Sequence, residues 1–192
     1  MMKTITHTGS GRQINVYEHD DYDPKQYGAI VDIRQADILI GDIPDVVQFA
    51  KTRHPERPII VIHGSNCFNN MGAGLAKTIA NVWPAADAID KTTPKGDKSK
   101  LGNYSFVNVD GRVVIINLYT QYHYGKGLQL SYPALEAGLM MVVDQCNATY
   151  DEPIYLIPKY IGCGHAGGDY SKVKVIIDKV MEGQPYYLFD NK

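Results

Sequence analysis

Two glycine-rich segments, each set between an apolar run and a helix-like run, constrain the fold of this 192-residue sequence most strongly. Residues 66–74 follow the continuous apolar run 59–62, and residues 162–168 follow the apolar run 154–157. Short continuous apolar runs are typical of strands buried on both faces of a sheet. A repeated order of strand, loop and helix predicts an α/β fold.

The same two segments have the chemistry of anion sites. Glycine lets backbone N–H groups approach a ligand without a Cβ in the way. The start of a helix adds N–H donors without intrahelical partners and a partial positive charge, which together suit phosphate. Two such loops at one edge of a sheet could hold both halves of a diphosphate. Glycines that only form tight turns are the alternative for each loop.

Two common nucleotide motifs are excluded. Gly72 and Gly74 give a G-x-G pattern, but the third glycine of a dinucleotide-binding fingerprint is missing. An acidic residue at the end of a second strand, about 20 residues further on, is missing too. A P-loop is excluded because no Gly-Lys-Ser/Thr follows.

Hairpins interrupt the alternation of strands and helices. Asp110-Gly111 between the runs 104–109 and 113–119 is a strong hairpin signal. The runs 5–8 and 13–17 flank Gly9-Ser10-Gly11 and predict a second hairpin. The sheet is therefore expected to be mixed. Further strands are expected at 29–33, 37–40 and 186–189, helices at 46–53, 75–82, 132–146 and 170–181, and loops at 20–25, 63–70 and 91–100, the last of them mobile.

Composition limits the class of protein. With 44% apolar residues and a net charge of −2, the chain reads as one soluble domain without the basic character expected of a nucleic-acid binder. No run of about 18 apolar residues and no signal peptide are seen, so a cytoplasmic protein without a membrane partner is expected. Cys67, Cys146 and Cys163 form no disulfide or zinc pattern, and neither a metal site nor a cofactor is expected.

Three motifs together resemble the macro-domain family: Gly41-Asp42-Ile43, then Asn66-Cys67 with Met71-Gly72-Ala73-Gly74, then Ile161 to Asp169. The resemblance covers residues 36–190. It is to the branch of ADP-ribose 1″-phosphate phosphatases, terminal ADP-ribose protein glycohydrolases and antitoxins that remove ADP-ribose from DNA. It implies a three-layer α/β/α sandwich with a mixed central sheet. Residues 36–192 would form the macro domain, and residues 1–35 an added N-terminal hairpin.

The resemblance also implies ligand contacts. Asp42 would accept a hydrogen bond from the adenine amino group, with a backbone contact from Ile43, and Asn66 would face the distal ribose. For Asp42 and Asn66 the alternative is an ordinary turn residue. The two phosphates and the distal ribose would meet the two loops, through Met71, Gly72, Ala73 and Gly74, and through Gly162, Cys163, Gly164, His165, Ala166 and Gly167.

The sequence departs from its relatives at the catalytic position. Glycohydrolase and antitoxin members carry a lysine directly after a threonine, whereas Gln121 follows Thr120 here. Glutamine can neither form a Schiff base nor act as a general base. The remaining catalytic candidates are Asp169, Asn66 and His123, with His165 nearby: a carboxylate could activate water and a histidine could protonate a leaving oxygen. Asp169 as a helix N-cap and His123 as a packed loop residue are the alternatives.

These residues predict a hydrolase whose ligand is ADP-ribose or ADP-ribose 1″-phosphate. The first hypothesis is an ADP-ribose 1″-phosphate phosphatase. The alternative is an ADP-ribose-binding module without catalysis, and a further one is an ADP-ribosyl hydrolase that works without the lysine.

Overall fold

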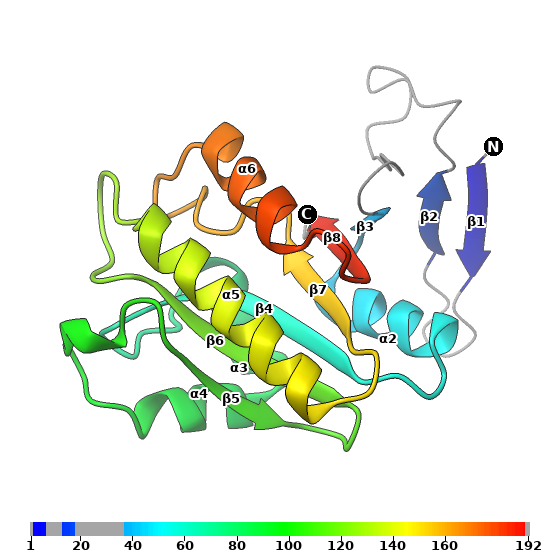
Figure 1. Ribbon diagram of the computed structural model, residues 1–192, viewed down its shortest axis with the longest axis horizontal. Coiled ribbons are helices and arrows are strands. Elements are labelled where there is room, and N and C mark those ends of the chain that lie inside the picture. Colours follow the sequence, from blue (N-terminus) through cyan, green and yellow to red (C-terminus); the bar gives the residue numbers. More distant parts are fainter. Residues whose placement is uncertain (1, 7–12, 18–36, 191–192) are drawn as a thin grey trace.

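A six-stranded mixed sheet forms the centre of the molecule (Figure 1). The computed structural model describes residues 2–6, 13–17 and 37–190. The sheet has the strand order β3-β8-β7-β4-β6-β5. Neighbouring strands are parallel except for β5, which pairs antiparallel with β6. The bounds are β3 (Asp37–Ile40), β4 (Ile59–Asn66), β5 (Tyr104–Asn108), β6 (Val113–Gln121), β7 (Ile154–Pro158) and β8 (Tyr186–Asp190).

Helices cover both faces of this sheet, so the predicted three-layer α/β/α sandwich is confirmed. One face carries α5 (Tyr132–Thr149) and α6 (Tyr170–Val180). The other carries α2 (Ile43–Arg53), α3 (Gly74–Val82) and α4 (Pro84–Lys91). Residues of β4 alternate between the two apolar cores: Ile60 and Ile62 face α5 and α6, whereas Ile59 and Val61 face the other helices. This alternation explains the continuous apolar run in the sequence.

The Asp110-Gly111 hairpin forms as predicted. The Asp110 carboxylate accepts hydrogen bonds from the backbone N–H groups of Arg112 (3.0 Å) and Val113 (2.8 Å). Gly111 has φ +82°, a left-handed conformation that glycine adopts without strain. The hairpin places β5 at the edge of the sheet, where it is the one antiparallel strand.

Two local predictions were wrong, and one helix was not predicted. Residues 63–66, expected in a loop, extend β4, because they stay paired with β6 as far as Asn66 beside Gln121. Pro84 follows the end of α3 as expected, but it also occupies the first turn of α4, a helix that was not predicted, where its missing N–H costs nothing. The segment 91–100, expected to be mobile, ends in the short 3-10 helix Lys98–Lys100, and Lys100 is only 6% exposed.

The N-terminal hairpin is a separate two-stranded sheet of β1 (Met2–Thr6) and β2 (Gln13–Tyr17). Its antiparallel pairing was predicted, although β1 begins earlier in the chain than expected. The turn at 9–11, the expected loop 20–25 and the expected strand 29–33 lie outside the described residues. The division at residue 35 into an extension and a macro domain stays a prediction.

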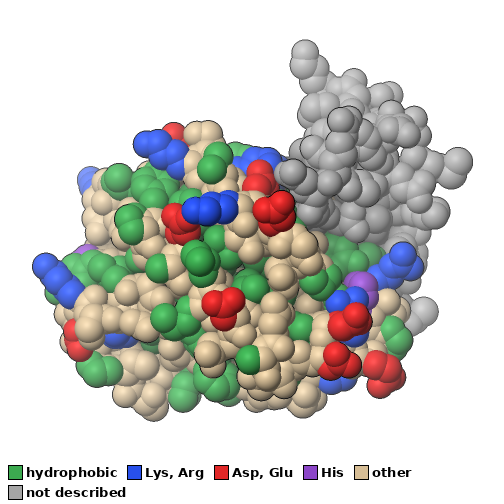
Figure 2. Space-filling view, in the orientation of Figure 1, with side chains coloured by type: hydrophobic (Ala, Val, Ile, Leu, Met, Phe, Trp, Pro, Cys, Tyr) green, Lys and Arg blue, Asp and Glu red, His purple; other side chains and the backbone are tan. Residues whose placement is uncertain are grey.

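The surface over α5 and α6 mixes acidic and basic side chains among apolar ones, without a continuous basic area (Figure 2). Such a mixture gives that face no electrostatic footprint for a polyanion. Within the part of the chain that the structure describes, no helix combines the length and apolar character of a membrane span.

Candidate functional site

A cleft of about 650 Å³ opens where β4 and β7 end, between the two glycine loops. Parallel strands bring their carboxyl ends to one edge of a sheet, and ligand sites of α/β proteins lie there. Eight of the residues expected to bind ligand line the cleft: Asn66, Gly72, Ala73, Gly74, Gly162, Gly164, His165 and Ala166. The structure thus brings the two loops together around one cavity.

The first loop leads directly into α3. Ala73 is the N-cap residue, and the N–H groups of the first helical turn have no intrahelical acceptor. Gly74 has φ +55°, and a Cβ built on it would lie 3.1 Å from Cδ2 of His165. The imidazole of the second loop therefore faces the first loop across the cleft.

Asn66 lines the cleft, but its side-chain amide forms hydrogen bonds within its own loop. Its Oδ1 accepts hydrogen bonds from the backbone N–H groups of Phe68 (3.0 Å) and Asn70 (3.3 Å). Its Nδ2 donates to the carbonyl oxygen of Asn70 (2.7 Å), and the Asn70 side chain in turn accepts from the N–H of Gly72 (2.9 Å). This is the geometry of a turn residue that shapes the loop.

The glycines of the second loop serve two different purposes. A Cβ on Gly168 would lie 2.4 Å from Leu130 and 2.7 Å from the carbonyl oxygen of Gly162, so close packing requires glycine there. A Cβ on Gly164 would meet nothing within 4 Å. Because Gly164 lines the cleft, its lack of a side chain leaves open space on the ligand's side.

Two predicted binding residues, Ile43 and Met71, are buried in the core beneath α2 and α3. Cys163 and Gly167 lie in the second loop without lining the cleft. The Cys163 thiol donates to the carbonyl oxygen of Ile161 (3.6 Å), and burial raises its pKa.

Asp42 precedes α2 as its N-cap residue and follows the end of β3. Asp42 does not line the cleft, but the residue before it contacts one that does. The N–H of Gly41 donates to the carbonyl oxygen of Asp190 (3.3 Å), and Asp190 is a lining residue at the end of β8. Asp42 therefore lies beyond the β8 end of the cleft.

Asp169 caps α6 and lies outside the cleft lining. Its Oδ1 accepts hydrogen bonds from the N–H (2.9 Å) and the hydroxyl (2.8 Å) of Ser171, and these bonds lower the pKa of the carboxyl group. The N–H of Asp169 donates to the hydroxyl of Tyr132 (2.9 Å). This is the geometry of the N-cap alternative.

His123 packs among loop aromatics and does not line the cleft. Its ring lies 4.4 Å from the ring of Phe68 and is stacked 4.6 Å from the ring of Tyr124, measured between centroids. Its Nδ1 donates to the carbonyl oxygen of Tyr124 (2.5 Å). This is the geometry of the packing alternative.

The cleft also contains Gln121, the residue in the place of the family lysine, and residues for which no role was predicted, among them Asn70, Tyr124, Tyr160, Phe189 and Asp190. Gln121 lies at the carboxyl end of β6, where its side chain donates to the carbonyl oxygen of His123 (2.8 Å). Among the described lining residues Asp190 is the only carboxylate, and none is a lysine or arginine. The one sequence feature that could have indicated Asp190 and Tyr160 as site residues is their position just after apolar strands.

The floor of the cleft is uncharged. His63 Nε2 lies 2.7 Å from Oδ1 of Asn117, whose Nδ2 donates to the carbonyl oxygen of Ala86 (2.9 Å) and to Ser105 (3.0 Å). Since Asn117 therefore accepts through its oxygen, the Nε2 of His63 carries a proton and donates it. Burial lowers the pKa of His63 to about 4, so the imidazole is neutral near pH 7. The described residues offer no group of three histidine, cysteine or acidic side chains that could hold a metal ion.

This arrangement can bind an anion with neutral groups. Backbone N–H groups at a helix N-terminus and in glycine loops suit phosphate without an ion pair. The amides of Asn70 and Gln121 and the imidazole of His165 add polar groups along the cleft.

No protein-family model matches the sequence. A 17.5 kDa protein of Enterobacteria phage T4, described as uncharacterized and encoded in the tk-vs intergenic region, is 31% identical over 142 residues, which cover 72% of this chain and 84% of the phage protein.

Several solved structures share the fold. A macrodomain protein from Streptomyces coelicolor superposes with a TM-score of 0.59 at 22% identity, over 81% of this chain and all of that one. DarTG of Thermosipho africanus, solved in complex with ADP-ribose, superposes with a TM-score of 0.63 at 16% identity, over 84% of this chain and 43% of that one. The chain therefore belongs to the same family as the phage T4 protein, and its fold is that of a macrodomain.

Proposed function

We propose that the cleft binds ADP-ribose or a close derivative, with the diphosphate held between the two glycine loops. The observation that carries the proposal is that both loops line one cavity of about 650 Å³ at the carboxyl edge of the sheet. The Thermosipho africanus structure, which shares the fold, contains ADP-ribose, and this lends support. A diphosphate would receive backbone N–H groups from both sides.

The order of the strands suggests which end of the ligand lies where. The cleft runs from Asp190, on β8 beside β3, to Asn66 and Gln121, on β4 and β6. Since neighbouring strands lie about 4.8 Å apart, the three gaps from β8 to β6 give an edge of roughly 14 Å, along which an elongated ligand can lie. Adenine would lie near Asp42 and Asp190, and the distal ribose near Asn66 and Gln121.

The finer part of the proposal is hydrolysis of a phosphate on the distal ribose. Water would attack phosphorus, the bond from phosphorus to the ribose oxygen would break, and a histidine would protonate the leaving oxygen. His165 suits this role, because it lines the cleft while His123 and Asp169 do not. Gln121 favours phosphate release over removal of ADP-ribose from protein or DNA, since it lacks the chemistry of the family lysine.

A second candidate is a reader that binds ADP-ribose without turnover. It is favoured by the charge of the cleft: among the described lining residues Asp190 is the only carboxylate, and it lies at the adenine end. A hydrolase that releases ADP-ribose from a modified protein or nucleic acid would have to use His165 or ordered water in place of the lysine.

Phosphate release from ADP-ribose 1″-phosphate separates these functions. The phosphatase predicts multiple turnovers, which are lost in His165→Ala even at concentrations of ADP-ribose 1″-phosphate that saturate the variant. Binding without turnover by the unmodified protein would favour the reader. Release of ADP-ribose from a modified protein or nucleic acid would favour the third function.

A further inference from the structure

Lys100 lies behind the first glycine loop and is almost completely buried. It comes from the 3-10 helix Lys98–Lys100, which does not line the cleft. Its side chain is 6% exposed. Burying an ammonium group is costly unless hydrogen bonds and opposite charge compensate it.

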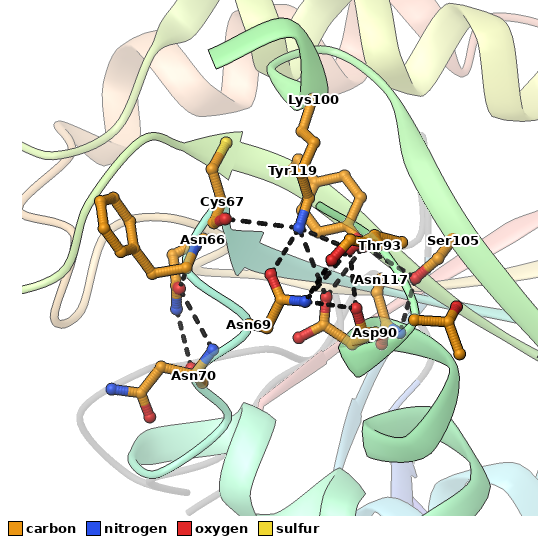
Figure 3. Close-up of polar contacts among 12 residues, drawn as sticks. Asn66, Cys67, Asn69, Asn70, Asp90, Thr93, Lys100, Ser105, Asn117 and Tyr119 are labelled. Atoms are coloured by element: carbon orange, nitrogen blue, oxygen red, sulfur yellow. Dashed lines mark hydrogen bonds and ion pairs between the residues drawn. The ribbon is translucent and has the colours of Figure 1, made fainter. Parts of the chain in front are cut away.

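Two of the groups that compensate this charge belong to the loop itself (Figure 3). Lys100 Nζ donates to Oδ1 of Asn69 (2.7 Å) and to the carbonyl oxygen of Cys67 (3.4 Å). Thr93 Oγ1 (2.6 Å) and the carboxylate of Asp90 (4.0 Å) complete the polar surroundings. The ammonium also lies 4.1 Å from the centre of the Tyr119 ring, a favourable cation–π distance.

Asn69 is the residue through which this contact shapes the loop. Its φ of +58° is left-handed, a conformation that asparagine adopts more readily than most non-glycine residues because its short side chain can form local hydrogen bonds. Its Nδ2 donates to the carbonyl oxygens of Asp90 (2.7 Å) and Thr93 (2.8 Å), so the whole amide is fixed. Directly after it, Asn70 and Gly72–Gly74 line the cleft.

We infer that Lys100 is a positioning residue for the phosphate loop. By fixing Asn69 and the Cys67 carbonyl from behind, it sets the direction in which the backbone N–H groups of Ala73 and Gly74 face the cleft. The inference rests on the proposed function for its ligand, but the contact with the loop exists without any ligand. Because Asp90 lies beside the ammonium, the effect is one of geometry rather than of long-range charge.

The chain offers a matched set of variants. Lys100→Met keeps the length of the side chain and removes its charge and its hydrogen bonds. Lys98→Met changes an exposed lysine two residues earlier, which lies 5.0 Å from the Tyr122 ring, and is the control. Asn69→Gly keeps the left-handed backbone available, leaves Lys100 beside Asp90 and removes the amide that Lys100 holds.

Two measurements test the effect of these substitutions on ligand binding and on the first loop. Calorimetry gives the Kd of ADP-ribose and of adenosine, which has no phosphate to reach the loop. Amide hydrogen exchange compares residues 67–72, whose N–H groups at Cys67, Phe68, Asn70 and Gly72 are hydrogen-bonded, with residues 162–168 of the second loop.

In Lys100→Met and in Asn69→Gly we expect ADP-ribose affinity to fall about ten-fold, as for the loss of one well-made hydrogen bond. Adenosine affinity should be unchanged, exchange should be faster in residues 67–72 only, and Lys98→Met should behave like the unmodified protein. The double variant should bind ADP-ribose no more weakly than the weaker single variant, since both changes act through one contact.

Several results would overturn the inference. One is a folded Lys100→Met protein with unchanged loop exchange and unchanged ADP-ribose affinity. Another is an equal loss for ADP-ribose and adenosine, which would show a general loss of structure. If the unmodified protein does not bind ADP-ribose, the proposed function fails. Loop exchange in Lys100→Met then decides alone whether Lys100 holds the loop.

Discussion

Gly164→Val tests whether the second loop leaves space for a ligand, because the valine should fill that space without disturbing the packing of the protein itself. A Cβ at Gly164 meets nothing within 4 Å, and the residue is exposed at the cleft. The folded protein can therefore accept the side chain, and we expect the free energy of unfolding to change by no more than about 0.5 kcal/mol. In the proposed complex, however, the valine occupies the space through which a phosphate approaches the backbone of the second loop.

The expected loss of affinity follows from the contact that is blocked. A hydrogen bond to a charged group contributes about 1.5–3 kcal/mol, so displacing the phosphate from one backbone N–H should raise the Kd of ADP-ribose by roughly 10- to 150-fold. Calorimetry measures this loss, and thermal unfolding shows that the variant is folded.

Gly168→Ala is the matched control, because its Cβ would lie 2.4 Å from Leu130 and 2.7 Å from the carbonyl oxygen of Gly162. It should destabilise the protein by about 1–3 kcal/mol through overpacking. A Gly164→Val protein that unfolds and binds ADP-ribose like the unmodified one would refute the assignment of this loop to phosphate.

Four further changes probe other parts of the account. Gly74→Ala should lower both unfolding temperature and ADP-ribose affinity, because φ +55° strains alanine and the new Cβ would lie 3.1 Å from the His165 ring; calorimetry and melting curves check this. Asp42→Ala should weaken ADP-ribose by about 1–3 kcal/mol but leave ribose 5-phosphate, which lacks adenine, unaffected; an equal loss for both contradicts the adenine contact. Asp169→Ala should lower the unfolding temperature by removing the cap of α6, and should leave ADP-ribose affinity unchanged. Burial lowers the pKa of His63 to about 4, so as pH falls below about 6.5 the unfolded state takes up the proton first. Between pH 7 and pH 4.5 the unmodified protein should therefore lose about 2–3 kcal/mol more stability than His63→Gln, and equal losses would show that His63 is not held neutral.

The order of elements could be predicted because its signals are local. Continuous apolar runs mark β4 and β7, and Asp110-Gly111 marks the hairpin between β5 and β6. The polar end of β4 could not be recognised as strand, because its pairing with β6 compensates for the lack of apolar residues. Likewise Pro84 both follows the end of one helix and starts another, and the second role is visible only in the structure.

The candidate site also has features that the sequence predicts and features that depend on contacts between distant segments. That the two loops would meet followed from parallel strands ending at one edge. The presence of Asp190 and Tyr160 in the cleft depends on the strand order β3-β8-β7-β4, which is set by pairing between distant segments. Lys100 lies in a polar segment that looks solvated, and its burial depends on partners up to 33 residues away in the chain. Asp169 was correctly recognised as a possible N-cap, but its distance from the cleft lining could not be read from sequence.

The most direct test of the central claim is calorimetric titration of the protein with ADP-ribose, with AMP and NAD as comparators. A cleft that holds the whole diphosphate between its two glycine loops predicts micromolar or tighter binding of ADP-ribose and clearly weaker binding of AMP. Absence of ADP-ribose binding, or equal affinity for AMP, would contradict the account, since the loops would then be turns that serve only the fold or the cleft would be shaped for a different ligand.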